Sequence, residues 1–289
     1  MTTTPTTGTV RLAEAEARRL AELALAEDLA GGLDVTTLAT VPEGHHGVAR
    51  LVAREDGVVA GLPIAAAVFA ARLGSAEGVR TTATDGDRVT AGQVLMEVAG
   101  PTRELLTAER SALNLVTHLS GVATLTARWV AAVEGTGALI RDTRKTMPGL
   151  RAAEKYAVRC GGGLNHRMGL HDQALIKDNH VVAAGGVAPA IRAVRAAFPD
   201  LFCEVECDTL EQGEEAVREG AVLVLRDNMG LAELRAAVAV CRPHGTRTEA
   251  SGGLTLDRAR AVAGTGVDYL AVGALTHSAP VLDLALDLT

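Results

Sequence analysis

The stretch that decides the fold is "ALIKDNHVVAAGGVAPAIRAVRAAFPDLFCEVEC", residues 174 to 207. Its two ends, "ALIK" and "FCEVEC", are short apolar runs of strand length. The segment between them, Val187 to Phe198, has the length and the apolar spacing of a helix. A strand, a helix and a second strand in this order predict two parallel strands joined by a helical crossover.

The same alternation extends over the second half of the chain, from Ala138 onward. Further strand-like runs are "ALIRDT", "AVLVLRD", "RTEASGG" and "DYLAVG", and helix-like segments lie at 210–219, 231–240 and 256–263. Repeated units of this kind predict a parallel sheet, either an open doubly wound sheet or a barrel. Polar residues at several strand ends favour the barrel, because these ends form the mouth of a barrel's active site.

The first hundred residues follow a different pattern. Residues 11–30 predict an amphipathic helix that ends at two glycines, and residues 47–61 and 79–98 predict β-hairpins. The segment "DGDRVTAGQVLMEV" is similar to the hairpin of lipoyl and biotinyl carrier domains. Because no lysine precedes Lys145, a carrier function is excluded and we expect only a structural hairpin here.

Two segments connect these halves. An Ala- and Leu-rich stretch from Thr102 to Val133, interrupted by Gly121, predicts one or two helices. The final "VLDLALDLT" alternates apolar and polar residues, so we expect it to return as a strand to the first domain.

Composition excludes several classes of protein. The chain has 289 residues, 48% of them hydrophobic, and a formal net charge of -7, which argues against a general nucleic-acid or anionic-membrane binder. Residues 1–10 have neither an apolar core nor a positive charge, so we expect neither a signal peptide nor a membrane span.

The four cysteines lack the paired spacings of a zinc site or a disulfide framework, which indicates a reducing cytoplasm. On a strand, Cys203 and Cys207 lie about 13 Å apart, too far for a disulfide.

Positive charge is concentrated in residues 141–180, which contain eight Arg and Lys residues and all three lysines of the chain. Arginine serves as the general surface cation here, so a lysine at the end of "ALIK" predicts that Lys177 faces a polar cavity; the alternative is a solvated strand end. We expect Lys155, within the amphipathic "LRAAEKYAVRC", to be an ordinary surface lysine.

A candidate anion site consists of Arg144, Lys145, His166, Arg167 and Lys177, which come from three segments that end at one rim of the predicted barrel. Several charged hydrogen bonds, each contributing roughly 1.5 to 3 kcal/mol, suit a ligand with more than one anionic group. A surface network of ion pairs is the alternative, but the same forty residues contain only four acids.

Carboxylates and glycines follow the next strands. Glu204 and Glu206 share one face of "FCEVEC", and Asp227 ends the following strand. These acids could hold Mg²⁺ or stabilise a cationic sugar ring, or they could simply neutralise the basic cluster. The glycines of "ASGG" (250–253) and "AVGA" (271–274) predict a phosphate site, although each could be only a tight turn.

Taken together, several motifs resemble the quinolinate phosphoribosyltransferase family from about residue 20 onward. They are "TAERSALN", "DTRKT", "CGGGLNHR", "ALIKDNH", "EVEC", "RDNM", "ASGG" and "TGVDYLAVGALTHSAP". The resemblance implies an N-terminal α/β sandwich domain (1–118, with 279–289 packing back onto it) and an incomplete α/β barrel of six to seven strands (119–278). It also implies a homodimer or hexamer.

The resemblance further implies transfer of the phosphoribosyl group of PRPP to quinolinate, with release of pyrophosphate and CO₂, in NAD biosynthesis. By this match the residues that bind substrate are Arg110, from across a dimer interface, with Thr143, Arg144, His166, Arg167, Ser251, Gly252, Gly253 and Gly273. Lys145, Lys177, Glu206 and Asp227 are the expected catalytic residues, and Glu206 and Asp227 are the expected ligands of Mg²⁺, directly or through water.

Three other functions are open at this stage: transfer to a different acceptor, a Schiff-base lyase with Lys177 as nucleophile, and a non-catalytic anion sensor. The chain also departs from the family pattern at Arg226, where relatives tend to have an apolar residue. If the strand alternates regularly, Arg226 points away from Asp227; if the strand bulges, the two side chains pair.

Overall fold

The computed structural model describes residues 10–289, which form two compact units. The first unit contains the chain up to Leu125 together with Ala152–Gly162 and Ala279–Thr289, and the second contains Thr126–Arg151 and Gly163–Ser278. The expectation for the extreme N-terminus concerns residues that lie almost entirely outside the described part. Between residues 10 and 289, every helix is too short or too polar to cross a membrane.

The first unit is a mixed α/β domain. Its elements are α1 (Glu14–Leu29), α2 (Val35–Thr40), β1 (His46–Ala53), β2 (Gly57–Val58), α3 (Leu62–Leu73), β3 (Val79–Thr81), β4 (Arg88–Val89), β5 (Val94–Pro101), most of α4 (Thr102–Ala132), α5 (Arg151–Cys160) and β12 (Leu284–Leu288). A four-stranded antiparallel sheet has the order β12-β1-β5-β3. Its apolar face packs with α1, α3 and α4 in a core that includes Leu51, Phe69, Met96 and Leu105.

The hairpin predicted over 79–98 is present in part, because β3 pairs antiparallel with β5, whereas the hairpin predicted over 47–61 does not form. β1 pairs with β5 and β12, whereas β2 pairs with β4 in a separate two-stranded sheet. β3 pairs with β5 and not with β4, so "DGDRVTAGQVLMEV" is not a hairpin either. The local turn signals were correct, but burial of the apolar faces selected partners that are distant along the chain.

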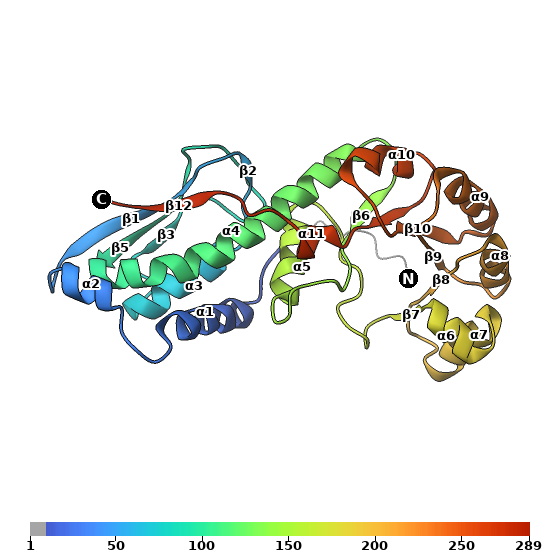
Figure 1. Cartoon of the computed structure of the whole chain (residues 1–289), viewed down its shortest axis with the longest axis horizontal. Coiled ribbons are helices and arrows are strands. Elements are labelled where there is room, and N and C mark those ends of the chain that lie inside the picture. Colours follow the sequence, from blue (N-terminus) through green and yellow to red (C-terminus); the bar gives the residue numbers. More distant parts are fainter. Residues whose placement is uncertain (1–9) are drawn as a thin grey trace. The chain divides into compact units, whose positions relative to one another are not determined.

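The helix after β5 is continuous through Gly121, which explains that glycine. A Cβ atom at Gly121 would lie 2.0 Å from the carbonyl oxygen of Pro280, so the glycine lets the returning chain cross the helix closely. That chain continues into β12, which pairs antiparallel with β1 and places Leu286 opposite Leu51. Figure 1 shows β12, in red, beside β1, in blue.

The second unit contains six parallel strands and the helices that connect them. Its elements are β6 (Leu139–Arg141), β7 (Ala174–Ile176), α6 (Asp178–Ala184), α7 (Val187–Ala197), β8 (Cys203–Glu206), α8 (Leu210–Arg218), β9 (Leu223–Asp227), α9 (Leu231–Cys241), β10 (Arg247–Ser251), α10 (Ala259–Ala263), β11 (Tyr269–Ala271) and α11 (Ala274–His277). Short 3₁₀ turns, η1 (Arg242–His244) and η2 (Leu256–Arg258), precede β10 and α10.

These strands form an incomplete barrel, which confirms the predicted fold class. Their order is β6-β11-β10-β9-β8-β7, so the first strand pairs with the last and the sheet is open between β6 and β7. An isolated bridge between Arg141 and Leu164 adds a remnant of a seventh strand beside β6. The carboxyl ends of all six strands therefore lie on one rim, as the repeated units predicted.

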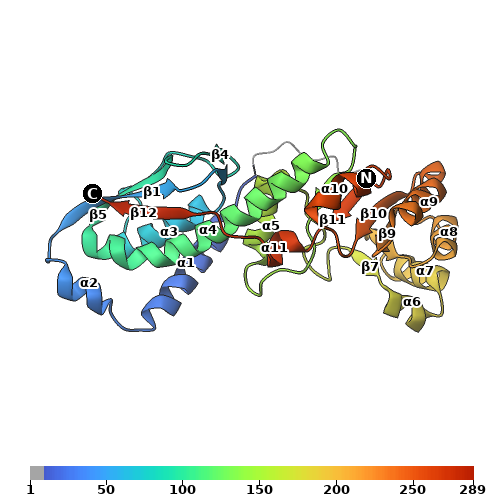
Figure 2. The ribbon, with the colours of Figure 1, turned by 45° about the horizontal axis from the view of Figure 1, so that its top comes forward.

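Helices cover the outside of this barrel, as Figures 1 and 2 show for α7, α8 and α9 beside β8, β9 and β10. Alternation along the strands separates the two faces. Val205 and Val224 pack in the outer core, whereas Leu225 and Asp227 line the interior cavity. The start of α8 is specified locally by a capping box between Thr209 and Gln212.

Lys155 contradicts its expected position on the surface. Its side chain is buried, with 1% of the residue exposed, on α5 beside the equally buried Glu154. His118 Nε2 lies 2.9 Å from Glu154 Oε1. The prediction was wrong because the amphipathic pattern of α5 was assigned one solvated face, while tertiary packing buries Ala153–Val158 throughout.

Candidate active site

A cavity of about 380 Å³ opens at the carboxyl ends of the barrel strands. Residues predicted from the sequence account for much of its lining, and the structure brings them together from six different connections. They are Thr143, Arg144, Lys145, His166, Arg167, Lys177, Asp227, Ser251, Gly252, Gly253 and Gly273.

Four cationic side chains are part of this lining. Arg144 and Lys145 follow β6, Arg167 follows the glycine-rich segment, and Lys177 follows β7. Arg144 Nε is buried without a hydrogen-bond partner in the described chain, and burial together with the Arg144 charge lowers the pKa of Arg167. Four cations that line one cavity indicate a site for an anionic ligand.

The local backbone supports these cations. Thr143 Oγ1 accepts a hydrogen bond from the backbone N–H of Lys145 at 3.0 Å, which shapes the turn after β6. Arg167 Nη1 donates to the carbonyl oxygen of Gln173 at 3.3 Å.

Two carboxylates face the cations from neighbouring strands. Glu206, at the end of β8, accepts a hydrogen bond from Lys177 Nζ at 2.6 Å. Asp227 ends β9, lines the cavity and accepts from Asn228 Nδ2 at 2.7 Å. Glu206 does not line the cavity itself, but it forms an ion pair with Lys177, which does.

Glycines after β10 and β11 also line the cavity. Gly252 has a φ of 79°, and a Cβ atom there would lie 2.4 Å from Asn228 Oδ1 and 2.6 Å from Asp227 Oδ1. At Gly273 a Cβ atom would lie 2.9 Å from Lys145 Cδ. The position of Gly252 therefore requires glycine, whereas at Gly273 the absence of a side chain lets Lys145 lie close to the backbone.

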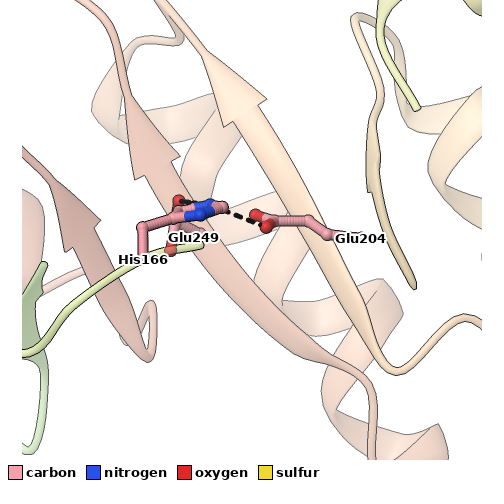
Figure 3. A group of neighbouring side chains, drawn as sticks. All are labelled: His166, Glu204 and Glu249. Carbon is pink, nitrogen blue, oxygen red and sulfur yellow. Dashed lines mark ion pairs between the residues drawn. The ribbon is translucent and has the colours of Figure 1, made fainter. Parts of the chain in front are cut away.

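A buried polar layer consists of His166, Glu204 and Glu249 (Figure 3), of which His166 and Glu249 line the cavity. His166 Nε2 lies 2.9 Å from Glu204 Oε2 and 3.6 Å from Glu249 Oε1. The His166 Nδ1 atom accepts the backbone N–H of Arg167 at 2.7 Å, so Nε2 carries the ring proton and donates it toward the carboxylates. The three groups are close enough to bridge with a metal ion, but a protonated Nε2 cannot coordinate one.

Burial dominates the electrostatics of this layer. It raises the pKa of Glu204 to about 7 and that of Glu249 to about 7, and for Glu249 the neighbouring Glu204 charge adds to the effect. Arg141 Nη1 donates to Glu249 Oε2 at 2.7 Å, and Gln173 Nε2 donates to Glu204 Oε2 at 2.8 Å. These partners partly offset the cost of burying two acids.

Three contributors to the site were not predicted from the sequence. Glu249 lies two residues before Ser251 on β10, so strand alternation from Ser251 would have placed it on the interior face. Asp142 Oδ1 accepts the backbone N–H of His166 at 2.8 Å. His277 lines the cavity from the end of α11, and no spacing in the sequence connected it with the other residues.

The remaining two positions are Arg110 and Arg226. Arg110 is exposed on α4 and is not part of the cavity lining of its own chain. Arg226 is fully buried and donates to backbone carbonyl oxygens of Cys207 and Thr209, so it faces away from Asp227 as regular alternation predicted.

Comparison with known proteins assigns the family. Residues 34–120 match the model for the N-terminal domain of quinolinate phosphoribosyl transferase, and residues 122–287 match that for its C-terminal domain. The chain is 54% identical over 276 residues to nicotinate-nucleotide pyrophosphorylase (carboxylating) of Mycobacterium leprae, covering 94% of this chain and 97% of the relative. A probable enzyme of the same name from Bacillus subtilis is 43% identical, with 83% of each chain covered.

Solved structures agree with this assignment. NadC from Streptococcus pyogenes superposes with a TM-score of 0.91 at 38% identity, covering 97% of this chain and 99% of the other. The nicotinate-nucleotide pyrophosphorylase from Francisella tularensis gives a TM-score of 0.91 at 35% identity, covering 97% and 98%. Matched along nearly its whole length in sequence and in fold, the chain belongs to the quinolinate phosphoribosyltransferase family.

Proposed function

We propose that this protein transfers the phosphoribosyl group of PRPP to the ring nitrogen of quinolinate, a step of NAD biosynthesis that also releases pyrophosphate and CO₂. The observation that carries the proposal is that Arg144, Arg167 and Lys177 line the same cavity as the glycine turns after β10 and β11. A dicarboxylate and a phosphorylated sugar suit these cations and these turns. The names of the relatives at 54% and 43% identity support the same reaction.

The chemistry needs positioning more than covalent help from the protein. The pyridine nitrogen forms a bond to the anomeric carbon of PRPP, while the bond from that carbon to pyrophosphate breaks and its electrons leave with the pyrophosphate. The carboxylate next to the ring nitrogen then leaves as CO₂. Its bonding electrons stay beside the cationic nitrogen until that ring carbon takes up a proton.

The residues of the cavity divide this work. Arg144, Arg167 and Lys177 would hold the ring carboxylates. Lys145, which lies next to the backbone at Gly273, would bind the pyrophosphate. The carboxylates of Glu206 and Asp227 would stabilise the positive charge that develops on the ribose.

The remaining predicted residues have supporting roles in this proposal. The hydroxyl group of Ser251 and the backbone of Gly252 and Gly253 would bind phosphate, and Thr143 would shape the turn that presents Arg144. His166 would complete the quinolinate side. Its ring nitrogens are already engaged by Arg167 and the buried acids, so its contribution is to hold Arg167 in place.

Magnesium is part of the proposal. Mg²⁺ usually takes one or two protein carboxylates together with substrate phosphates, and Glu206 and Asp227, at the ends of adjacent strands, fit this pattern. These two residues would hold the ion directly or through water. When bound, the ion neutralises charge on the leaving pyrophosphate.

Arg110 would complete the quinolinate site from a second copy of the chain, in a homodimer or a hexamer. Its exposure on α4 and its absence from the cavity lining of its own chain support a role in the neighbouring site. The four cysteines are free thiols, which supports a reducing compartment such as the cytoplasm.

The other functions fit the site less well. A Schiff-base lysine lies in an apolar or cationic pocket, whereas Lys177 forms an ion pair with Glu206 at 2.6 Å. A simple anion sensor would not need Glu206 and Asp227 beside the cations.

Mass analysis of the products after incubation with quinolinate, PRPP and Mg²⁺ tests the proposal. We expect nicotinate mononucleotide and stoichiometric CO₂, and an absence of both would disprove it. Arg110→Ala should weaken quinolinate binding by about 1.5 to 3 kcal/mol, the contribution of one charged hydrogen bond. Activity regained on mixing Arg110→Ala with an inactive Lys177→Ala variant would demonstrate a shared site, whereas no recovery would argue that Arg110 acts within its own chain.

A further inference from the structure

Arg226 is an unusual residue for the outer face of a barrel strand. It has no exposed surface and is among the largest fully buried side chains of the described protein. It forms no ion pair with a carboxylate within residues 10–289, and its Nε and Nη2 atoms make no hydrogen bond there. Burying a cation without a carboxylate partner is costly, so the hydrogen bonds that Arg226 does form are needed to offset that cost.

Its two hydrogen bonds to the backbone come from one nitrogen atom and reach one turn, while the guanidinium also interacts with the thiol of Cys241 on α9. Arg226 Nη1 donates to the carbonyl oxygen of Cys207 at 3.0 Å and to that of Thr209 at 2.7 Å. Cys207 to Thr209 form the connection between β8 and α8, and Thr209 is the N-cap residue of α8. The guanidinium therefore holds the backbone immediately after Glu206.

Arg226 lies near the carboxyl end of β9, beyond the last residue of β9 that pairs with β8. The ladder between β8 and β9 ends where Cys207 N donates to Leu225 O at 3.1 Å. β9 continues for two more residues and pairs only with β10 there, with Asp227 opposite Ser251. Arg226 thus supplies hydrogen bonds between β9 and the β8–α8 turn beyond the point where the ladder stops.

A glycine in the facing helix accommodates the guanidinium. Gly213 lies inside α8, where glycine is less favourable than alanine. A Cβ atom at Gly213 would lie 1.9 Å from Arg226 Nη2 and 3.0 Å from its Cζ atom. The helix therefore carries an unfavourable residue at the one place where the arginine needs space.

We propose that Arg226 is a positioning residue that ties the β8–α8 turn to β9 and so fixes the separation of the Glu206 and Asp227 carboxylates at the cavity. It is covalently adjacent to Asp227 and hydrogen-bonded to the residue that follows Glu206. The inference rests on the proposed function, in which these two acids serve the ribose and Mg²⁺. Placement errors of about 1 Å in such groups cost up to about a hundredfold in rate.

The test uses three variants of the full-length protein. Arg226→Met keeps the length and apolar volume of the side chain but removes the donor, and Gly213→Ala displaces the guanidinium while keeping its charge. Arg195→Met is the matched control, because Arg195 Nη2 donates to Glu219 O at the other end of α8, away from the acids.

The kinetic measurement separates positioning from general damage. We expect Arg226→Met and Gly213→Ala to raise the KM for PRPP and lower kcat by about tenfold each, with the KM for quinolinate changed less than about twofold. Arg195→Met should match the wild type. Equal increases of both KM values, or wild-type kinetics in Arg226→Met, would overturn the proposal.

Hydrogen exchange provides a measurement that does not depend on the proposed reaction. The amides of Asp208, Thr209 and Gly213 should exchange about tenfold faster in Arg226→Met than in Arg195→Met, because the turn loses two anchoring bonds. Unchanged exchange of these three amides would overturn the proposal that Arg226 holds the turn, even if the enzyme were active. If the wild type made no nicotinate mononucleotide, the proposed function would fail, while the exchange data would still decide whether Arg226 holds the turn.

Discussion

The core of the first unit and the interior of the barrel are both buried, but they are built from opposite chemistry. The first core is apolar, with Leu51, Phe69 and Met96 between the sheet and its helices. The barrel interior instead buries Arg141, Glu204 and Glu249. An apolar core stabilises a fold without directing a ligand, whereas paired buried charges hold cationic side chains in place at a site.

The largest expected effect comes from emptying the apolar core. Phe69→Ala should lower the free energy of unfolding by about 3 to 5 kcal/mol, because it removes a side chain that is 1% exposed and leaves a cavity. Denaturant unfolding followed by circular dichroism measures this change. A loss below about 1 kcal/mol would show that this core repacks easily and would weaken the contrast with the barrel.

A change in the cation cluster should act on binding more than on folding. Lys177→Met should weaken quinolinate binding by about 1.5 to 3 kcal/mol, since one charged contact is lost. Isothermal titration measures the affinity, and Glu206→Gln is the control that removes the partner of Lys177 but keeps the ammonium group. Equal losses of quinolinate affinity in both variants would assign the effect to the ion pair and not to the ligand contact.

The buried acids should make the stability of the barrel depend on pH. Burial raises the pKa of Glu249 from 4.5 to about 7, so the folded state binds this proton more tightly. The contribution of the protonated Glu249 carboxyl to the free energy of unfolding is complete below pH 4.5 and is lost as the pH rises through 7. The free energy of unfolding changes there with a slope of up to roughly 1 kcal/mol per pH unit. Glu249→Gln should flatten that slope.

The single tryptophan, Trp129, is buried in the second unit and reports on its unfolding. Its fluorescence during denaturant unfolding at pH 5 and pH 8 therefore compares Glu249→Gln with the wild type. Parallel pH dependence in the two proteins would contradict the shifted pKa of Glu249.

The smallest effect is expected at the surface of the first unit. Arg18 and Glu14 form an ion pair on α1, with both side chains largely exposed. Glu14→Gln should change the free energy of unfolding by less than about 0.5 kcal/mol, because solvent and salt screen exposed pairs. Thermal unfolding at low and high salt measures it. A larger loss would show that this helix depends on surface charge.

Local sequence signals predicted most of the second unit. Short apolar runs and helix-length segments identified the six strands of the barrel, and the residues after those strands include most of the cavity lining. This worked because each βα unit is local, and parallel strands place all their carboxyl ends on one rim. His277 was missed because nothing in its spacing ties it to the basic segment, whereas Glu249 was missed although strand alternation from Ser251 places it on the interior face.

The first unit was predicted less well. Its turns and the antiparallel pairing of β3 with β5 were recognisable, but the partners of β1, β2 and β4 come from distant parts of the chain. Pairing in an antiparallel sheet depends on which faces are buried together, and that is a property of the assembled core.

By itself, the sequence determined the repeated strands and helices, the concentration of cations between residues 141 and 180, and the glycines that allow close backbone approach. These follow from local periodicity and residue chemistry. Three features depend on the tertiary structure: Lys155 is buried, His166 faces two acids, and Arg226 donates a hydrogen bond to the turn after Glu206. The physical reason is that burial and hydrogen-bond partners depend on which segments meet in space, and no spacing along one chain contains that information.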